Sequence, residues 1–315
     1  MIQLGSTEMP TVNAIIPICN WAERLEECLK QLSIQKYGGD FTITVVDCGS
    51  NDRTLEVAKS FGYEILTKKH SPIEGLIGLT NHGLKNSSAE LVWKVDADNI
   101  MADGMVLSRL VEPYLQDPRI NLSVPRQITN ENYNSFTNYL TLREMVPYNA
   151  MISRSLRKDS WNLVEDMWYG IYNSTLMRRS AIDMVGGWDQ DIRVLRRLRN
   201  LNMSRAALVC DACYYHDQRV DPISFLKKLK RRINYFGSMD ARILAEYFLT
   251  NFENNKNETQ DSLGSINELW RIARTGGDRT IRNISNEFIF QMVTFTALLT
   301  SPIAAWRIFR RGLYQ

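Results

Sequence analysis

Residues 12 to 46 read VNAIIPICNWAERLEECLKQLSIQKYGGDFTITVV, and this stretch decides the fold. Its two ends, residues 12–18 and 41–46, are short runs rich in β-branched residues, which is typical of buried strands. Residues 22–35 lie between them and carry four apolar residues on one helical face: Leu25, Cys28, Leu29 and Leu32. A strand, a helix and a second strand in this order predict a parallel crossover unit.

The same alternation continues toward residue 100. Helical patterns follow SNDRT at residues 50–54 and cover residues 76–86, and strand-like runs cover residues 63–66 and 90–95. This pattern predicts an α/β fold with a doubly wound, mainly parallel sheet flanked by helices. In such sheets, ligands bind beyond the carboxyl ends of the strands.

Composition excludes several classes of protein. The chain has 315 residues, 44% of them hydrophobic, which is enough for a large globular core and excludes a disordered chain. The net charge of +3 is far below the excess of a dedicated nucleic-acid binder, so we expect no nucleic-acid partner. Five cysteines form an odd, scattered set, which favours reduced thiols over a disulfide framework or a zinc ribbon. Reduced thiols favour a cytoplasmic protein, and the first 18 residues show no signal-peptide pattern.

Two carboxylates follow the predicted strand at residues 90–95, in the stretch VDADN at residues 95–99. Asp96 and Asp98, spaced i and i+2 at a strand end, can turn toward one hard cation such as Mg²⁺ or Mn²⁺, which prefers oxygen ligands. The alternative interpretation is that both are turn residues, because Asp and Asn are common after strands.

Five motifs occur in order along the chain: IIPICNWAERLEECLKQLSIQ, ITVVDCGSNDRTLEVAKSFG, GLTNHGLKNSSAELVWKVDADNIM, RRSAIDMVGGWD and DACYYHD. In this order and spacing the chain resembles the family 2 glycosyltransferases, which have the GT-A fold. The resemblance covers residues 10–125 and 170–220. It implies an enzyme that transfers a sugar from a nucleotide diphosphate sugar to an acceptor, usually with inversion at the anomeric carbon.

The resemblance also implies roles for individual residues. Asp47 matches the family aspartate that contacts the nucleotide base, and Pro17 and Asn20 match the loop after the first strand. Asp98 matches the metal ligand of the DxD motif, and Asp96 matches its ribose or phosphate contact. The chain departs from the family pattern at Cys48, which follows Asp47, and at Trp21, which follows Asn20. The base of the donor, uridine or guanosine, therefore stays open.

His216 follows a predicted strand in CDACYYHDQR, where the family often has a histidine near the metal or the phosphates. The resemblance therefore implies a divalent cation, Mn²⁺ or Mg²⁺, bound by Asp98 and His216. A satisfied structural histidine is the alternative. Asp217 and Arg219 are expected to orient the histidine or meet phosphate, or else to form a solvated turn.

An inverting transfer needs a carboxylate that takes the proton of the acceptor hydroxyl. Aligning QDIRVLRRLR with the family motif makes Asp191 this base, followed by a helix with arginines at positions 196, 197 and 199. In the other alignment Asp189 and Asp191 merely follow the double glycine, and Glu165 and Asp166 become the reserve candidates, unless they form a solvated acidic pair.

We expect a catalytic domain over residues 1–220 and a helical extension over residues 221–315. The extension carries a basic stretch at residues 227–232, an uncharged stretch at residues 288–306 and further arginines at residues 307–311. These features favour contact with the cytoplasmic face of a membrane and a saccharide or lipid-linked acceptor. A solvated helix face, a buried hairpin and a true span remain open alternatives.

Two other functions are compatible with the pattern. A nucleotide-sugar-binding protein with lost or weak turnover would also explain Cys48 and the altered base motif. A nucleotidyltransferase would carry a glycine-rich, lysine-bearing loop after the first strand, and PICNWAERLEE lacks it.

Overall fold

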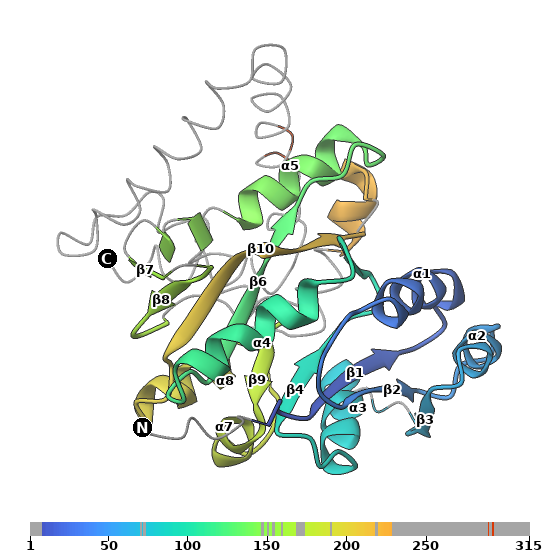
Figure 1. Cartoon of the computed structure of the whole chain (residues 1–315). Helices are drawn as coiled ribbons and strands as arrows, with labels where there is room; N and C mark the ends of the chain where they lie inside the picture. The colour runs from blue at the N-terminus through green and yellow to red at the C-terminus, as the bar shows by residue number, and fades with distance from the viewer. Residues whose placement is uncertain are drawn as a thin grey trace, which may run out of the picture. The chain divides into compact units, whose positions relative to one another are not determined.

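The computed structural model describes residues 8–69, 71, 74–145, 148–149, 151–152, 155–158, 160–167, 174–189, 191–217, 220–228, 289 and 292. The chain divides into two compact units, one of residues 1–128 and 151–217 and one of residues 129–150 and 218–315. The first unit contains the sheet that carries the candidate site (Figure 1).

The strands of the first unit form one mixed sheet in the order β3-β2-β1-β4-β9-β6-β10-β8-β7, and β5 pairs with β10 off this path. The strands are β1 (Val12–Ile18), β2 (Phe41–Asp47), β3 (Glu64–Thr67), β4 (Leu91–Lys94), β5 (Asn99–Met101), β6 (Leu122–Ile128), β7 (Leu156–Arg157), β8 (Asn162–Val164), β9 (Leu176–Arg178) and β10 (Ala206–His216). β1 is parallel to both β2 and β4, which confirms the predicted crossover. β9 runs antiparallel to β4 and β6, so the second half of the sheet is mixed.

Helices cover both faces of the parallel half of the sheet. The helices of this unit are α1 (Ala22–Ser33), α2 (Thr54–Ser60), α3 (Gly75–Lys85), α4 (Val106–Gln116), α7 (Arg179–Met184) and α8 (Asp191–Asn200). The apolar residues of α1, α2 and α4 share one core with alternate residues of β1, and α1 buries the four residues predicted for its apolar face. Helix α3 packs on the opposite face, where a Cβ on Gly83 would lie 2.6 Å from Cγ2 of Ile15 (Figure 1).

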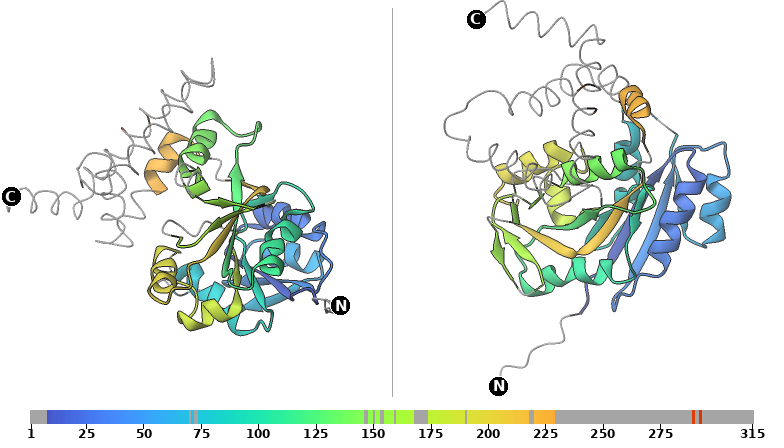
Figure 2. Two further views of the ribbon diagram at one scale, coloured as in Figure 1. Left: turned by 60° about the vertical axis from the view of Figure 1, so that its left-hand side comes forward. Right: turned by 90° about the horizontal axis from the view of Figure 1, so that it is seen from above.

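Strand β10 pairs with β6 and β8 within the sheet and with β5 off its main path. It pairs in parallel with β6 (Figure 2). The register of this pairing shifts between Val209 and Cys213. Beyond this bulge, the last residues of β10 also pair with β5 in antiparallel fashion, with His216 opposite Asn99. A bulge bends its strand and re-aims the side chains that follow it. The end of β10 therefore lies beside the turn that carries the two aspartates.

In the second unit, helix α5 (Ser135–Glu144) forms a small core with the chain near residue 220. Thr137 accepts from the Val220 N–H at 3.1 Å and donates to the Val220 carbonyl at 3.0 Å. Among the described residues, no helix has the length and apolar character needed to cross a membrane. Apart from residues 289 and 292, the uncharged stretch at residues 288–306 lies outside the described residues, and so do residues 229–232 of the basic stretch.

Candidate active site

The two aspartates of the DADN turn lie between two strands. Asp96 follows β4, and Asp98 precedes β5. The Val95 N–H donates to the Ile15 carbonyl at 3.0 Å, which keeps the chain beside β1, and the Asn99 N–H donates to the Asp96 carbonyl at 2.9 Å, which closes the turn. The residues are therefore turn residues, and both carboxylates also lie at the carboxyl edge of the sheet.

Asp98 lies next to His216 because β5 pairs with the end of β10. His216 Nε2 is 3.3 Å from Asp98 Oδ2, and the two side chains are only 11% and 13% exposed. The backbone strengthens this approach, since the Asp217 N–H donates to the Asp98 carbonyl at 2.7 Å. The structure thus brings together the two residues predicted as metal ligands.

The separation of Asp98 Oδ2 and His216 Nε2 suits two neighbouring ligands of one cation. Ligands at about 2.1 Å and a right angle around an octahedral ion lie about 3 Å apart, close to the 3.3 Å between these atoms. A pair of one carboxylate and one imidazole fits Mn²⁺, which takes oxygen ligands and is a first-row transition metal. Among the described residues, no three His, Cys, Asp or Glu side chains gather at one point. The candidate protein ligands in the described part of the chain are therefore two, Asp98 and His216.

The other aspartate of the turn has a different partner. Lys94 Nζ lies 2.9 Å from Asp96 Oδ2, and the two side chains are 12% and 20% exposed. The positive charge of Lys94 thus balances the partly buried carboxylate of Asp96, two residues before Asp98. Sequence motifs did not point to Lys94, although its position two residues before Asp96 on a strand places both side chains on the same face.

Arg24 of α1 is a second residue that the motifs did not reveal. Its guanidinium forms a 2.6 Å ion pair with the carboxylate of Asp217, which is 3% exposed, and also donates to the Asp217 carbonyl. The same guanidinium lies 5.5 Å from the ring centroid of Trp21. Arg24 therefore fixes the residue that follows His216. The available signal was its place in the first turn of a helix that begins at the carboxyl edge of the sheet.

Asp47 at the end of β2 is fully buried. Its carboxylate accepts hydrogen bonds from the N–H groups of Gly49 at 2.8 Å and Ser50 at 2.9 Å, and from the Ser50 hydroxyl at 2.5 Å. Gly49 has a φ of +93°, which a residue with a side chain rarely adopts. In these contacts Asp47 shapes the loop after β2, and its role toward a nucleotide base stays a prediction.

The two other residues predicted for donor binding differ in exposure. Pro17 is buried inside β1, opposite Val46 of β2. Asn20 is exposed with a φ of +52°, and its N–H donates to the Ser50 hydroxyl at 2.9 Å. Its side-chain oxygen accepts from the Asn51 N–H at 2.8 Å, so Asn20 ties the loop after β1 to the loop after β2.

The expectation of reduced thiols is wrong for Cys19 and Cys48, which form a disulfide. Ile18 and Asp47 are register partners at the ends of β1 and β2, so the residues that follow them leave the sheet side by side, with Cα atoms 5.2 Å apart. The signal in the sequence was that Cys19 directly follows the first predicted strand and Cys48 comes two residues after the end of the second. The other cysteines, Cys28, Cys210 and Cys213, are free, and the inference of a cytoplasmic protein loses the support it drew from reduced thiols.

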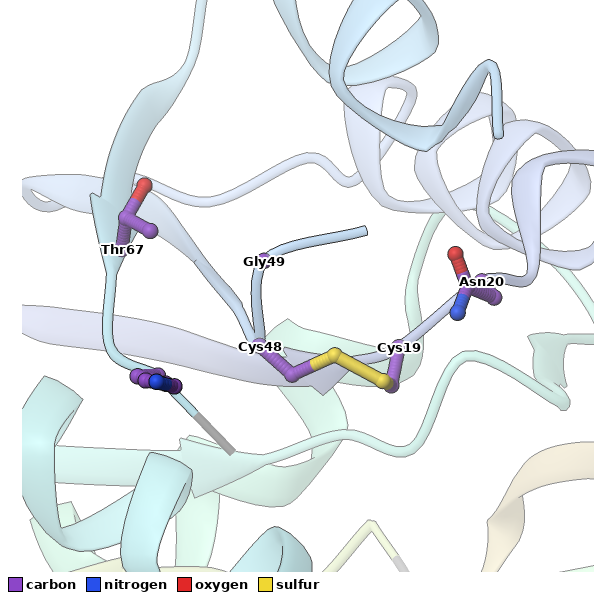
Figure 3. Close-up of a pocket in the computed structure, with 6 residues that line it drawn as sticks. Cys19, Asn20, Cys48, Gly49 and Thr67 are labelled. Atoms are coloured by element: carbon purple, nitrogen blue, oxygen red, sulfur yellow. A yellow bond between two sulfur atoms is a disulfide. The ribbon is translucent and has the colours of Figure 1, made fainter. Parts of the chain in front are cut away.

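A pocket of about 450 Å³ opens at the same edge of the sheet. The disulfide crosses its wall, with Asn20 on one side and Thr67 on the other (Figure 3). Gly49 and Lys69 complete the lining. The pocket therefore lies among the loops that follow β1, β2 and β3, where ligands bind in doubly wound sheets.

The GGWD loop is held on helix α3. Gly187 has a φ of +93°, and a Cβ there would lie 2.8 Å from Oδ1 of Asn81. Asn81 accepts from the Trp188 N–H at 2.7 Å and donates to the Trp188 carbonyl at 2.8 Å. The loop leads into α8, whose first residue is Asp191. The role of Asp191 as a base stays a prediction.

The competing carboxylates are all paired with arginines. Asp189 forms an ion pair with Arg197 at 2.8 Å, and Glu165 is paired with Arg205. Asp166 binds Arg199 at 2.7 Å. Hydrogen bonds from that guanidinium, and then from the Ser204 hydroxyl, hold the pKa of Asp166 below its usual range. The ion pairs with arginines favour structural roles for these carboxylates, and the lowered pKa makes Asp166 in addition a weaker base.

Comparison with known proteins decides the family. The model of "Glycosyl transferase family 2" matches residues 13–186, which is more than half of the chain. The chain belongs to glycosyl transferase family 2. This match confirms the family inferred from the five ordered motifs.

Curated relatives of this family 2 chain match it over limited stretches. Glycosyltransferase AglE of Haloferax volcanii is 32% identical over 99 residues, which cover 30% of this chain and 32% of the relative. An N-acetylglucosaminyltransferase of Rhizobium leguminosarum bv. viciae is 31% identical over 38% of this chain and 29% of the relative. The dolichol-phosphate mannosyltransferase of Pyrococcus furiosus is 31% identical over 32% of this chain and 29% of the relative. The chain thus spans about a third of the length of these relatives.

Solved structures share the fold. The mannosyltransferase PcManGT of Pyrobaculum calidifontis, in complex with GDP-Man and Mn²⁺, matches with a TM-score of 0.52 at 16% identity, over 98% of this chain and 81% of that chain. TarS 1–349 of S. aureus, in complex with UDP, matches with a TM-score of 0.51 at 14% identity, over 88% of each chain. These likenesses confirm the GT-A fold of the family 2 chain.

Proposed function

We propose that this family 2 chain is a metal-assisted, inverting glycosyltransferase that moves a hexosyl or N-acetylhexosaminyl group from a UDP- or GDP-linked sugar to an acceptor hydroxyl. The observation that carries the proposal is the 3.3 Å approach of Asp98 Oδ2 and His216 Nε2 at the carboxyl edge of the sheet. Such a pair at this edge suits an ion that binds the phosphates of a donor.

In this proposal, Asp98 and His216 hold the divalent cation, Mn²⁺ or Mg²⁺. When bound, the cation supplies Lewis-acid stabilisation of the negative charge on the departing nucleoside diphosphate. Asp96, held by Lys94, contacts the ribose or a phosphate, and the pocket beside Asn20 receives the base. The co-crystallised ligands of the two solved relatives, GDP-Man with Mn²⁺ and UDP, support this choice of ligands.

The acceptor side of the reaction requires a base. Asp191 takes the proton of the acceptor hydroxyl as its oxygen attacks the anomeric carbon, and the bond to the diphosphate breaks on the opposite face. Two observations support Asp191 over its competitors: it begins α8 directly after the GGWD loop that Asn81 holds, and the rival carboxylates are paired with arginines.

The acceptor is proposed to be a saccharide or a lipid-linked molecule. We assign catalysis to residues 1–220 and acceptor or membrane contact to residues 221–315, at the cytoplasmic face. The basic and uncharged stretches of the extension support membrane contact. The name of the Pyrococcus furiosus relative supports a lipid-linked acceptor, and the N-acetylglucosaminyltransferases support a saccharide.

The test is incubation with a panel of UDP- and GDP-linked hexoses and N-acetylhexosamines, with mass spectrometry of the products in the presence of lipid extract or oligosaccharides. We expect release of nucleoside diphosphate with one donor, and loss of release after chelation of divalent cations. Tight donor binding without release or transfer would instead identify a nucleotide-sugar-binding protein with lost turnover.

A further inference from the structure

The Cys19–Cys48 disulfide lies in the wall of the pocket at the carboxyl edge of the sheet (Figure 3). It joins the first residue after β1 to the first residue after β2. Neither loop is otherwise covalently constrained among the described residues, because the three other cysteines are free. The disulfide therefore acts on the loops that line the pocket.

The residues next to each cysteine are the ones that shape the pocket. Asn20 has a φ of +52° and Gly49 a φ of +93°, so each loop turns sharply right after its cysteine. Hydrogen bonds also join the loops, and those between Asn20 and residues Ser50 and Asn51, next to the disulfide, are exposed. The Cys48 N–H also donates to the Ile18 carbonyl at 3.0 Å. Water competes for exposed hydrogen bonds, whereas it cannot replace a covalent bond.

We propose that the Cys19–Cys48 disulfide makes donor-nucleotide binding dependent on thiol redox state, with the oxidised protein as the tight-binding form. The inference rests on the proposed function, because it takes the pocket as the site of the nucleotide. In the oxidised protein the two loops are held together before the ligand arrives. In the reduced protein the two thiols move apart to van der Waals contact, and binding must order the loops again.

The disulfide forms by thiol–disulfide exchange with a small-molecule disulfide such as oxidised glutathione. The thiolate of one cysteine attacks the oxidant and gives a mixed disulfide, with release of one small thiol. The second cysteine displaces the other small thiol and closes the Cys19–Cys48 bond. Two protein thiols are thereby oxidised, and one disulfide of the oxidant is reduced to two thiols.

Two of the three remaining cysteines are poorly placed to compete in this exchange. Cys28 is fully buried, and burial raises the pKa of its thiol. Burial also raises the pKa of the Cys213 thiol. The thiolate is the attacking species, so a raised pKa slows exchange at these two positions. The third, Cys210, is tested by substitution below.

The experiment is calorimetric titration of UDP and of GDP, each with Mn²⁺, into the full-length protein before and after treatment with a phosphine reductant. Thiol titration of the denatured protein should give three thiols before and five after reduction, because the sequence has five cysteines and two of them form the disulfide. We expect the affinity of the preferred nucleotide to fall about tenfold on reduction, because the entropy lost in ordering the loops then opposes binding.

Two variants and a melting curve complete the test. The double variant Cys19→Ser/Cys48→Ser should bind like the reduced protein and ignore the reductant. Cys210→Ser removes a free cysteine of β10, outside the pocket lining, and should respond to the reductant like the wild type. If the double variant fails to fold, the comparison of oxidised and reduced wild type, each shown to be folded by its melting curve, still decides.

Two results would overturn the inference. Equal affinity of oxidised and reduced wild type for the nucleotide would refute redox dependence and leave the proposed function intact. Failure of the oxidised protein to bind either nucleotide with Mn²⁺ would refute the proposed function, and the inference with it.

Discussion

Asp98 is held in place by a backbone hydrogen bond of its own and by the contacts of the residue that follows it. Its carbonyl accepts from the Asp217 N–H, and the next residue, Asn99, is fully buried and donates from its side chain to the Ser174 hydroxyl at 3.0 Å. The carboxylate and the imidazole of His216 are therefore close before any ligand arrives. Such prior arrangement lowers the ordering cost of binding a cation.

Asp191→Asn tests the proposed base. We expect nearly unchanged binding of the nucleoside diphosphate and transfer slowed by about a hundredfold or more, the scale of removing a general base. Transfer is measured by release of the nucleoside diphosphate, and binding by calorimetry. The matched control is Asp166→Asn, whose carboxylate is engaged by Arg199 and should leave transfer nearly intact. Equal turnover of Asp191→Asn and wild type would move the role to another group.

Arg24→Met tests a residue that acts through its neighbour. Loss of the ion pair to Asp217 should loosen His216 and weaken apparent Mn²⁺ affinity by about tenfold or more, as is usual for groups that orient metal ligands. The measurement is nucleotide binding as a function of Mn²⁺ concentration.

Two companion variants separate positioning from general stability. Arg24→Lys keeps the charge and should recover part of the affinity for Mn²⁺. Arg119→Met removes a guanidinium that is 70% exposed and should leave that affinity unchanged. Wild-type Mn²⁺ dependence in Arg24→Met would show that Arg24 has no positioning role.

At the scale of elements, the start of α1 is capped by the loop that follows β2. The N–H groups of Trp21 and Ala22 donate to the Thr54 hydroxyl at 3.1 Å and to Asp52 Oδ2 at 3.3 Å. The first N–H groups of a helix lack partners within it, so these contacts satisfy them. The loops after β1 and β2 are therefore joined by these hydrogen bonds as well as by the disulfide. A conformational change in one loop should therefore displace the other.

Asp117 joins the end of α4 to the start of β10. It contacts Arg205 at 2.8 Å and Arg119 at 3.0 Å, and the Asp117 and Arg205 side chains are each 14% exposed. Hydrogen bonds from Arg119, followed by those from Arg205, hold the pKa of Asp117 below its usual range. We expect Asp117→Asn to lower the free energy of unfolding at pH 7 by on the order of 1–3 kcal/mol, as for hydrogen bonds to charged groups.

The pH dependence of this contribution has a defined sign. A carboxyl group whose pKa is lowered by folding stabilises the protein fully above its unfolded pKa of about 3.9 and loses this effect as the pH falls through the folded value. Urea unfolding of wild type and Asp117→Asn should therefore differ at pH 7, and the difference should shrink steadily as the pH falls below about 3.9. A difference that stays constant with pH would contradict an ionic origin.

For the whole molecule, the sequence predicted the parallel half of the sheet well, because β1 is a short apolar run rich in β-branched residues and α1 shows a clear period of 3.6 residues. The strand expected at residues 12–18 is β1 as observed, and the apolar face of α1 is the predicted one.

The disulfide was not predicted, because it depends on the register of β1 with β2. Arg24 and Lys94 were missed for a related reason: their partners are set by tertiary contacts or by side-chain direction, and the motifs that contain them assign neither a role.

The carboxyl-terminal extension leads to a prediction for the full-length chain. Basic residues at 227–232 and 307–311, with the uncharged stretch at 288–306, should bind the chain to anionic liposomes at low salt. Each basic residue near the surface contributes about 1 kcal/mol, and salt screens this attraction. Co-sedimentation at low and high salt measures it, and replacement of Lys227 and Lys228 by Gln should weaken it. A chain that stays in the supernatant at low salt would contradict membrane contact.

The central claim is that Asp98 and His216 bind a cation that in turn binds the donor diphosphate. Calorimetric titration of UDP and GDP into oxidised wild type and Asp98→Ala, with and without Mn²⁺, tests it most directly. The account predicts that one nucleotide binds tightly to wild type only with Mn²⁺, and that Asp98→Ala loses this Mn²⁺-dependent binding. Undiminished, Mn²⁺-dependent affinity in Asp98→Ala would contradict it.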